Sequence, residues 1–324
     1  MMGEHILFSY GFDGKGGAEK LIGDAIAKQL EDEALAWVHL DALHPDTPAW
    51  LEKEISYLDP FIIEALLEEA TRPRMTQIGD GALLILRGVN LNENEEPEDM
   101  VAVRLWIDPH RIVSVRRRKS KAVQDLREKL EAGHGPKDAG QFISMLTDLM
   151  FDRMEPVLAT LDDMTDDIEE KLLETVDTSL REEIIDVRKQ AILFRRHMAP
   201  QREAIGQLRM ADFSWLNEKH KRHLQESYNQ VTRYVEDLDA VRERAQIVKD
   251  ELANILSDRL NKNMYILSVI AAIFLPLGFL TGLLGINVGG IPGADNPDSF
   301  MIFCAILGLL VGLQVVLFKK FKWF

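Results

Sequence analysis

Four aspartates in the middle of the chain have the side chains and the spacing to attract a cation. Asp162-Asp163 is followed four residues later by Asp166-Asp167, so a helix would carry the two pairs on one face. Carboxylate oxygens are the ligands that hard cations such as Mg²⁺ prefer. Like charges at this spacing also repel each other, as on an ordinary solvated helix face. The sequence leaves both interpretations open.

Two histidines offer a second possible metal site. His220 and His223 lie three residues apart in a segment with a helical pattern, so both rings could contact one ion. A solvated histidine pair has the same spacing and is the alternative. His39 and His44 flank a turn and are weaker candidates. The sequence contains no GxSxG or HExxH motif and no other catalytic constellation, so we expect no enzyme.

The charge balance excludes one class of partner. The 324 residues include 53 acidic and 38 basic side chains, for a net charge of −15. Nucleic-acid binding needs a basic surface, and the cluster Arg116-Arg117-Arg118-Lys119 is too short to supply one, so we expect no nucleic acid. The single cysteine, Cys304, excludes an intrachain disulfide and a cysteine-rich zinc finger.

Two apolar segments in the last fifth of the chain predict that it crosses a membrane twice. Residues 264–284 and 300–318 would form helices of about 31 Å and about 28 Å, close to the thickness of the hydrocarbon core. Basic residues flank their outer ends, whereas the connecting loop, 285–299, contains only acidic charges. The positive-inside rule therefore predicts cytoplasmic N- and C-termini and an external loop.

The sequence predicts that the chain has three parts, which together position the candidate site residues. Residues 1–135 show short β-rich runs and two helices, which indicate a cytosolic α/β domain. Residues 136–260 show long helical patterns, which indicate cytosolic helices and a stalk, and residues 261–324 form the transmembrane hairpin. The fold class is thus an α+β cytosolic domain, with a mixed α/β N-terminal part and long helices, followed by two transmembrane helices.

Local patterns give approximate bounds for these elements. A helix starting near Leu216 meets no Pro or Gly before Pro276, so it would run about 90 Å from the cytosolic part into the first span. Such a helix could transmit a cytosolic event to the membrane or act as a static stalk. Strands are predicted at 5–9, 35–40, 75–78, 82–89, 101–107 and 111–115, and helices at 48–57, 60–69, 140–174 and 178–207.

A tripeptide at the end of the first span is similar to a known signature. Gly285-Ile286-Asn287 resembles the Gly-Met-Asn motif of the CorA family of divalent cation transporters, with Ile in place of Met. The flanking sequences 279–282 (FLTG) and 288–293 (VGGIPG) resemble those of the ZntB-type zinc transporter branch. The cytosolic sequences 71–74 (TRPR) and 197–202 (HMAPQR) resemble that branch as well, so the similarity extends over essentially the whole chain.

This resemblance implies an assembly and a cargo. It implies a funnel-shaped homopentamer, in which each chain has four identical partners, the first span lines the pore and the second forms an outer ring. It implies Zn²⁺ transport across the bacterial inner membrane, by uptake linked to the proton gradient, with no resident cofactor. A CorA-like channel for Mg²⁺ or several divalent cations is one alternative, and a membrane-tethered metal sensor or scaffold is an alternative of another class.

Steps of three and four residues back from the signature define one face of the first span. This face has no acid, base, His or Cys, whereas bare Zn²⁺ binds such ligands, so we expect the ion to pass largely hydrated. Small residues on this face would serve helix–helix packing equally well. The predicted pore-lining residues are Asn261, Met264, Leu267, Ala271, Leu275, Gly278 and Gly282.

The side chains on this face and in the loop have separate predicted roles. Leu275, Leu267 and Met264 would form apolar constrictions that gate by dewetting. Asp295 and Asp298 in the loop would attract cations to the external mouth. Neither span contains Asp, Glu, Lys, Arg or His, so a proton-coupling site would have to lie in the loop or in the cytosolic part.

Overall fold

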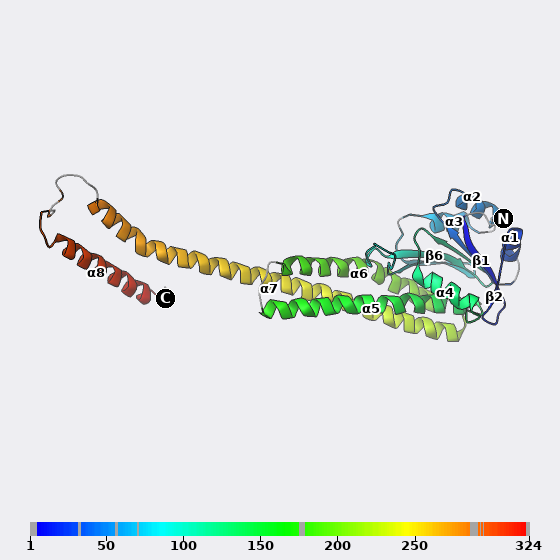
Figure 1. Cartoon of the computed structure of the whole chain (residues 1–324). Coiled ribbons are helices and arrows are strands. Elements are labelled where there is room, and N and C mark those ends of the chain that lie inside the picture. The colour runs from blue at the N-terminus through cyan, green and yellow to red at the C-terminus, as the bar shows by residue number, and fades with distance from the viewer. Residues whose placement is uncertain are drawn as a thin grey trace. The chain divides into compact units, whose positions relative to one another are not determined.

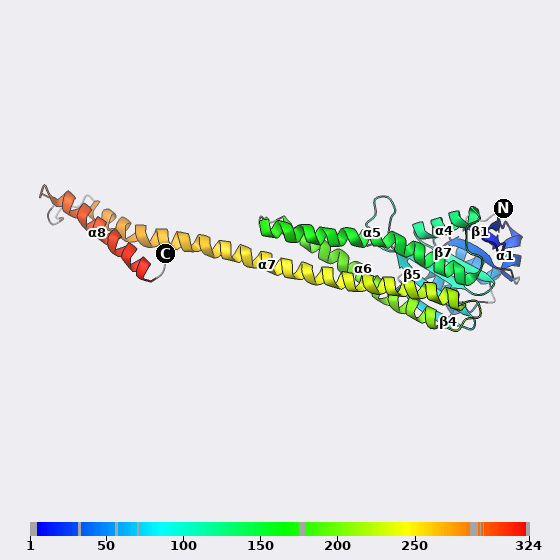
Figure 2. The same ribbon diagram turned by 90° about the horizontal axis from the view of Figure 1, so that it is seen from below.

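The structure is a computed structural model, and it divides the chain into two compact units, Met1–Asp250 and Glu251–Phe324 (Figures 1 and 2). The described residues are all except 1–4, 32–33, 56–57, 70, 175–178, 286–290, 292, 294 and 322–324.

A seven-stranded mixed sheet forms the centre of the N-terminal unit (Figure 1). Its strand order is β2-β1-β3-β7-β6-β5-β4, and only the β3–β7 pair is parallel. The register pairs Val38 with Val113 and Leu84 with Leu105. The strands are β1 (Ile6–Phe12), β2 (Ala18–Lys20), β3 (Ala36–Asp41), β4 (Arg74–Ile78), β5 (Gly81–Gly88), β6 (Val101–Ile107) and β7 (Arg111–Arg116).

Local sequence explains the hairpins at the end of this sheet. Gly79 adopts a φ of +60° in the β4–β5 turn, a conformation that glycine adopts without strain. The side chain of Asp108 accepts hydrogen bonds from the backbone amides of His110 and Arg111 in the β6–β7 turn. A Cβ atom at Gly81 would lie 2.2 Å from the ring of Trp106, so only glycine fits beside this indole.

Helices cover both faces of the sheet. On one face, Ile26, Leu51 and Leu66 pack into a single core with Val38 and Val113. On the other face, Trp37 meets Phe142 at a ring-centroid distance of 4.9 Å. Alternate residues of β3 thus point to opposite cores, as the two-residue period of a strand requires. The helices on the first face are α1 (Asp24–Glu31), α2 (Thr47–Glu54) and α3 (Pro60–Leu67).

Long helices follow the sheet, and α5, α6 and the N-terminal part of α7 lie side by side (Figures 1 and 2). In α7, Leu224, Val231, Leu238 and Ala245 recur every seven residues and are at most 1% exposed. This seven-residue spacing is typical of coiled-coil packing. The helices are α4 (Lys121–Glu131), α5 (Ala139–Glu174), α6 (Leu180–Met210), α7 (Glu218–Gly285) and α8 (Ser299–Lys320).

The predicted fold class is confirmed in its coarse form: an α/β domain, long helices and two C-terminal apolar helices. Helix α7 extends over 68 residues and continues through Pro276 to Gly285. Three short elements were not predicted, namely β2, α1 and α4. The division at residues 135 and 260 stays a prediction, as does the funnel-shaped pentamer.

Candidate functional site

The C-terminal unit contains the two helices that meet the requirements of a membrane span. Windows of 18 residues reach a mean hydropathy of 2.3 in α7 and 2.7 in α8, with 6% and 0% of those windows buried. The predicted spans, 264–284 and 300–318, lie inside these helices. Side chains this apolar and this exposed need lipid or a second protein surface around them.

Helix α8 packs against one face of α7. The amide of Gln314 in α8 donates a hydrogen bond of 3.1 Å to the carbonyl of Ala272 in α7. Less exposed positions recur every three or four residues along both helices, as expected where two helical faces meet. These positions are Val269, Ala272, Ile273, Pro276, Leu277 and Leu280 in α7, and Phe303, Leu307, Leu310, Val311, Gln314 and Phe318 in α8.

The predicted pore-lining residues lie on the other side of α7. At about 100° per residue, their mean direction is roughly opposite to that of the face against α8. Leu267 is 66% exposed and Leu275 is 73% exposed. A Cβ atom at Gly278 or Gly282 would meet no atom within 4 Å, so nothing described in this chain requires glycine there. The seven predicted positions, Asn261, Met264, Leu267, Ala271, Leu275, Gly278 and Gly282, are all exposed.

The signature tripeptide is only partly described. Gly285 is the last residue of α7 and is exposed, whereas Ile286 and Asn287 lie outside the described residues. In the loop, Asp295 and Asp298 are both exposed. The backbone amide of Asp298 donates to the side-chain oxygen of Asn296 at 3.0 Å, just before α8 begins. Both aspartates are accessible to solvent, and their role in attracting cations stays a prediction.

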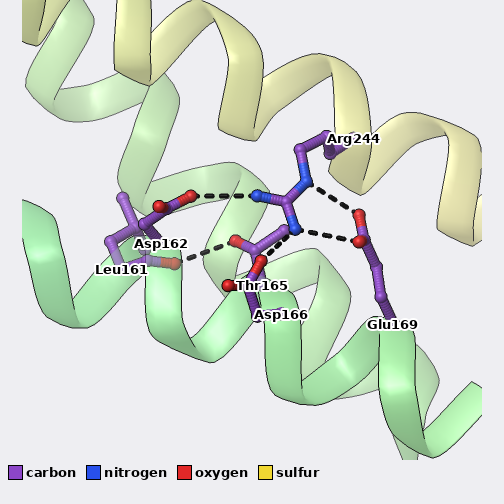
Figure 3. A network of polar contacts seen from close by, with 6 residues as sticks. All are labelled: Leu161, Asp162, Thr165, Asp166, Glu169 and Arg244. Carbon is purple, nitrogen blue, oxygen red and sulfur yellow. Dashed lines mark hydrogen bonds and ion pairs between the residues drawn. The ribbon is translucent and has the colours of Figure 1, made fainter.

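The acidic face of α5 is partly neutralised by an arginine of α7 (Figure 3). The guanidinium of Arg244 donates to Asp162 at 2.9 Å, to Glu169 at 2.8 and 2.9 Å, and to Asp166. The carboxylates of Glu169 and Asp166 raise the pKa of Arg244 above its usual value. Asp162 and Asp166 thus bind a protein cation, and the network joins α5 to α7.

The other two predicted aspartates have a different environment. Asp163 and Asp167 are exposed, and neither makes a side-chain hydrogen bond or ion pair within the described part of the chain. Metal binding by the four aspartates stays a prediction. A metal ion would have to displace Arg244 in order to reach Asp162 and Asp166 from their bound side.

The two histidines of α7 face different carboxylates. His220 is 6% exposed, and its Nε2 lies 3.4 Å from Asp138. A Cβ atom at Gly140 would lie 2.0 Å from the His220 ring, so this ring fills a space that a glycine leaves open. His223 instead lies near Asp148. Burial raises the pKa of the Asp148 carboxyl, and the nearby His223 opposes part of this rise. A metal shared by the two histidines remains a prediction.

A third group of side chains that could hold a metal ion was not predicted from the sequence. Ligand atoms of His5, His44 and Asp46 all lie within 4.8 Å of one another. His5 is 8% exposed, neither of its ring nitrogens has a hydrogen-bond partner in the described structure, and burial lowers its pKa, which favours the neutral, metal-binding ring. Two imidazoles and a carboxylate are a ligand set that suits Zn²⁺ and not Mg²⁺.

A short loop brings these three ligands together. The amide of Asp41, at the end of β3, donates to the carbonyl of His5 at 2.9 Å. The Asp41 side chain then accepts from the amide of Leu43 at 2.9 Å and shapes the turn that carries His44 and Asp46. Nothing in the local sequence around His5 points to His44, because only the β1–β3 pairing makes them neighbours.

The fourth candidate histidine has a structural role. His39 is 3% exposed, stacks on Phe8 at 4.7 Å and lies 2.8 Å from the hydroxyl of Ser114. Burial lowers its pKa to about 3, so the ring is neutral at physiological pH. The Nδ1 atom of His39 thus makes a hydrogen bond inside the core, and His39 does not belong to a group of possible metal ligands.

Known proteins resemble this chain over nearly its full length. Residues 32–320 match the family described as CorA-like Mg²⁺ transporter protein. The chain is 39% identical over 323 residues to the divalent cation transporter CmaX of Pseudomonas aeruginosa, which covers 98% of this chain and 96% of that protein. It is 36% identical over 317 residues to the zinc transport protein ZntB of Yersinia enterocolitica, with 98% and 95% covered.

The fold agrees with these matches. The solved structure of full-length CmaX superimposes with a TM-score of 0.85 at 38% identity, and it covers 98% of both chains. The resemblance inferred from the Gly-Ile-Asn tripeptide is therefore confirmed, and so is the expectation that the chain is not an enzyme, because these relatives are transporters. The chain belongs to the CorA-like family of divalent cation transporters.

Proposed function

We propose that this chain transports Zn²⁺ across the bacterial inner membrane as a homopentamer. The C-terminal part of α7 from each of five protomers lines the pore, and α8 forms the outer ring. Both termini lie in the cytoplasm, and the loop 285–299 forms the external mouth. Ions move inward, linked to the proton gradient.

The exposed, uncharged face of α7 is the observation that supports transport. Helix α8 covers one face of α7 and leaves the uncharged face around Leu275 exposed over the length of the span. In a hairpin that was only an anchor this face would meet lipid, whereas in an assembly it is free to meet the same face of other protomers. Two spans cannot enclose a water-filled path, so the open faces of several protomers have to surround it.

The composition of this face supports passage of a hydrated ion. Its residues offer methyl, methylene and amide groups but no ligand that replaces the water around Zn²⁺. Leu275 and Leu267 provide apolar constrictions, where a narrow pore can lose its water and close. For a divalent ion, a potential of about 100 mV, negative inside, favours inward movement by about 4.6 kcal/mol.

Different observations support the choice of Zn²⁺ as the transported ion and the coupling of its transport to protons. The relatives named as zinc transport proteins, with 36% identity over nearly the whole chain, favour Zn²⁺. The relative named as a divalent cation transporter, with 39% identity, favours the second candidate, a channel for Mg²⁺ or several divalent cations. Proton coupling needs a titrating group outside the spans, and the exposed Asp295 and Asp298 are the groups nearest the external mouth.

The test is ion uptake into liposomes that contain the purified protein. Zn²⁺ and Mg²⁺ are followed with metal-sensitive dyes, with and without a pH gradient, for the wild type and for Asn287→Ala. The proposal predicts Zn²⁺ uptake that rises with an inward proton gradient and falls at least tenfold in Asn287→Ala. Equal uptake of both ions, driven by membrane potential alone, would favour the second candidate. No uptake of either ion would contradict transport.

A further inference from the structure

A basic pocket lies in the N-terminal unit, between helix α6 and strands β5 and β6. It has a volume of about 390 Å³, within the range of small-ligand sites. The basic side chains that line it come from four separate segments. They are Arg87 in β5, Arg104 in β6, Arg117 and Arg118 after β7, and Arg196 and His197 in α6.

The carboxylates of the pocket do not balance these charges. Five arginines line it together with Glu69, Glu98 and Asp99, and Arg118 also pairs with Glu95 at 2.9 Å, which leaves one positive charge in excess. This local excess is unusual in a chain whose net charge is −15. Buried like charges repel strongly unless anions or hydrogen-bond acceptors compensate them.

Three of the arginines have no ion pair within the described structure. Arg104 is 2% exposed, and its guanidinium donates to the backbone carbonyl of Glu69 at 3.2 Å, the one acceptor it meets among the described residues. Arg87 donates to the carbonyls of Met100 and Thr71 at 2.6 and 2.8 Å. The side chain of Arg196 is exposed at the pocket and makes no hydrogen bond or ion pair with any described residue.

Several buried polar atoms in the pocket also have no partner. Among the described residues, these include Nε of Arg87, Arg104 and Arg117, and Nδ1 of His197. Burial and the neighbouring Arg87 lower the pKa of His197 to about 4, so this ring is neutral and can donate one N–H. Unpaired buried donors are costly, and their concentration around one cavity indicates a missing acceptor.

We propose that this pocket binds an oligophosphate anion, such as pyrophosphate or the phosphates of a nucleoside diphosphate. Guanidinium groups bind phosphate oxygens through paired hydrogen bonds. Three guanidinium groups without an ion pair in the described structure, those of Arg87, Arg104 and Arg196, suit several phosphate groups better than a lipid phosphodiester, which has a single charge. The side chains of Met100 and Leu193 add apolar wall beside the arginines, where a base could pack.

The bound anion would connect α6 to the sheet. Gln201 of α6 already exchanges two hydrogen bonds with the backbone of Arg87, at 2.6 and 3.1 Å. An anion held by Arg196 from α6 and by Arg104 from β6 would add a second link beside this one. Its binding should therefore raise the unfolding temperature of the N-terminal unit. This inference does not depend on ion transport, and its test measures binding only.

The test is isothermal titration of the full-length protein in detergent and metal-free buffer, with pyrophosphate and with ADP as probes. We expect saturable binding that weakens as salt increases, because the attraction is electrostatic. Arg196→Gln should weaken it about tenfold or more. Arg181→Gln, an exposed arginine of the same helix outside the pocket, is the matched control and should leave the affinity unchanged.

A second variant keeps the inference falsifiable if arginine substitutions disturb folding. Glu98 lines the pocket, and its Oε2 is buried without a partner in the described structure. Glu98→Gln removes a competing negative charge and should tighten binding severalfold. Tighter binding of ADP than of pyrophosphate would indicate that the adenine base packs against the apolar wall. Equal affinities would indicate that the pocket binds only the phosphates. The inference is overturned if neither probe binds, or if Arg196→Gln and Glu98→Gln bind as the wild type does.

Discussion

The N-terminal and C-terminal parts of helix α7 differ in how much of their apolar surface the chain itself covers. In the N-terminal part, Leu224, Val231 and Leu238 are at most 1% exposed, because α5 and α6 lie alongside. In the C-terminal part, Leu267 and Leu275 are 66% and 73% exposed within the same unbroken helix. The first part has a polar face for water and an apolar face for its own chain. The second part is apolar on nearly every side, and its own chain covers only one face.

This difference separates two sources of stability. The N-terminal part of α7 is stabilised by contacts within the chain, so substitutions there should act on folding. The exposed face of the C-terminal part contributes little to the stability of a single chain, so substitutions there should act on assembly and transport. Substitutions in the two parts of α7 and elsewhere in the N-terminal unit test this separation.

The largest effect is expected from a cavity in the bundle. Leu224→Ala removes a fully buried side chain and should lower the free energy of unfolding by about 2–5 kcal/mol. Leu267→Ala, the matched control on the exposed face, should leave it unchanged and should alter ion uptake. Tryptophan fluorescence of the full chain during urea unfolding measures the stability of both variants, because four of the five tryptophans, Trp37, Trp50, Trp106 and Trp215, lie in the N-terminal unit. The liposome assay measures uptake. Equal destabilisation by the two variants would contradict the separation.

A pH effect should also belong to the N-terminal unit. The pKa of His39 is about 3 when folded and about 6.5 when unfolded, so the unfolded chain binds the extra proton between these values. Stability should therefore fall as the pH decreases, by about 2 kcal/mol between pH 6.5 and pH 5 from this residue. Urea unfolding at a series of pH values checks this, and His39→Gln should have a shallower pH dependence. An unchanged slope in that variant would assign the effect to other groups.

A smaller effect is expected from the charge network in Figure 3. Arg244→Gln leaves Asp162, Asp166 and Glu169 without their shared cation and should destabilise the bundle by about 1 kcal/mol, because these groups are partly exposed. The loss should shrink as salt increases. Arg242→Gln, which breaks a single contact with Asp239, is the control and should cost less. Thermal unfolding at low and high salt distinguishes them.

The smallest effect on folding is expected at the three-ligand group of the N-terminal unit. His5→Gln should remove about one Zn²⁺ per protomer from the metal bound at equilibrium, with little change in uptake through the pore. Zinc X-ray absorption of the wild type should show nitrogen and oxygen ligands at about 2.0–2.2 Å. His134→Gln, in an exposed loop, is the control. Identical zinc content in the two variants would exclude this group as a binding site.

The elements were predictable where one periodic pattern extends far along the sequence. Helix α5 was expected at 140–174 and lies at Ala139–Glu174, and α6 was expected at 178–207 and lies at Leu180–Met210. The strands β5 and β6 were placed within two residues of their ends, because both are apolar runs between turns. The three-residue strand β2 is too short to show a pattern and was missed. The helices α1 and α4 were missed as well, because their apolar residues, Ile26 and Leu30 in α1 and Val123, Leu126 and Leu130 in α4, recur at helical spacing over only two or three turns.

Side-chain groups were predictable only where their members are close in sequence. The acidic repeat of α5 was visible, but its partner Arg244 lies 78 residues beyond Asp166. The His5, His44 and Asp46 group and the basic pocket also combine segments that only the sheet and α6 bring together. The basic run at 116–119 was visible in the sequence, but its neighbours in β5, β6 and α6 were not.

The central claim is that the face of α7 opposite α8 lines the ion path, and cysteine accessibility tests it most directly. In a Cys304→Ser background, which removes the single native cysteine, Ala271→Cys and Leu275→Cys are compared with Ile273→Cys and Leu280→Cys. The account predicts that a charged, water-soluble thiol reagent reacts with the first pair and blocks Zn²⁺ uptake, while the second pair, on the face against α8, is protected. Faster reaction at Ile273→Cys and Leu280→Cys, with uptake blocked there, would contradict it.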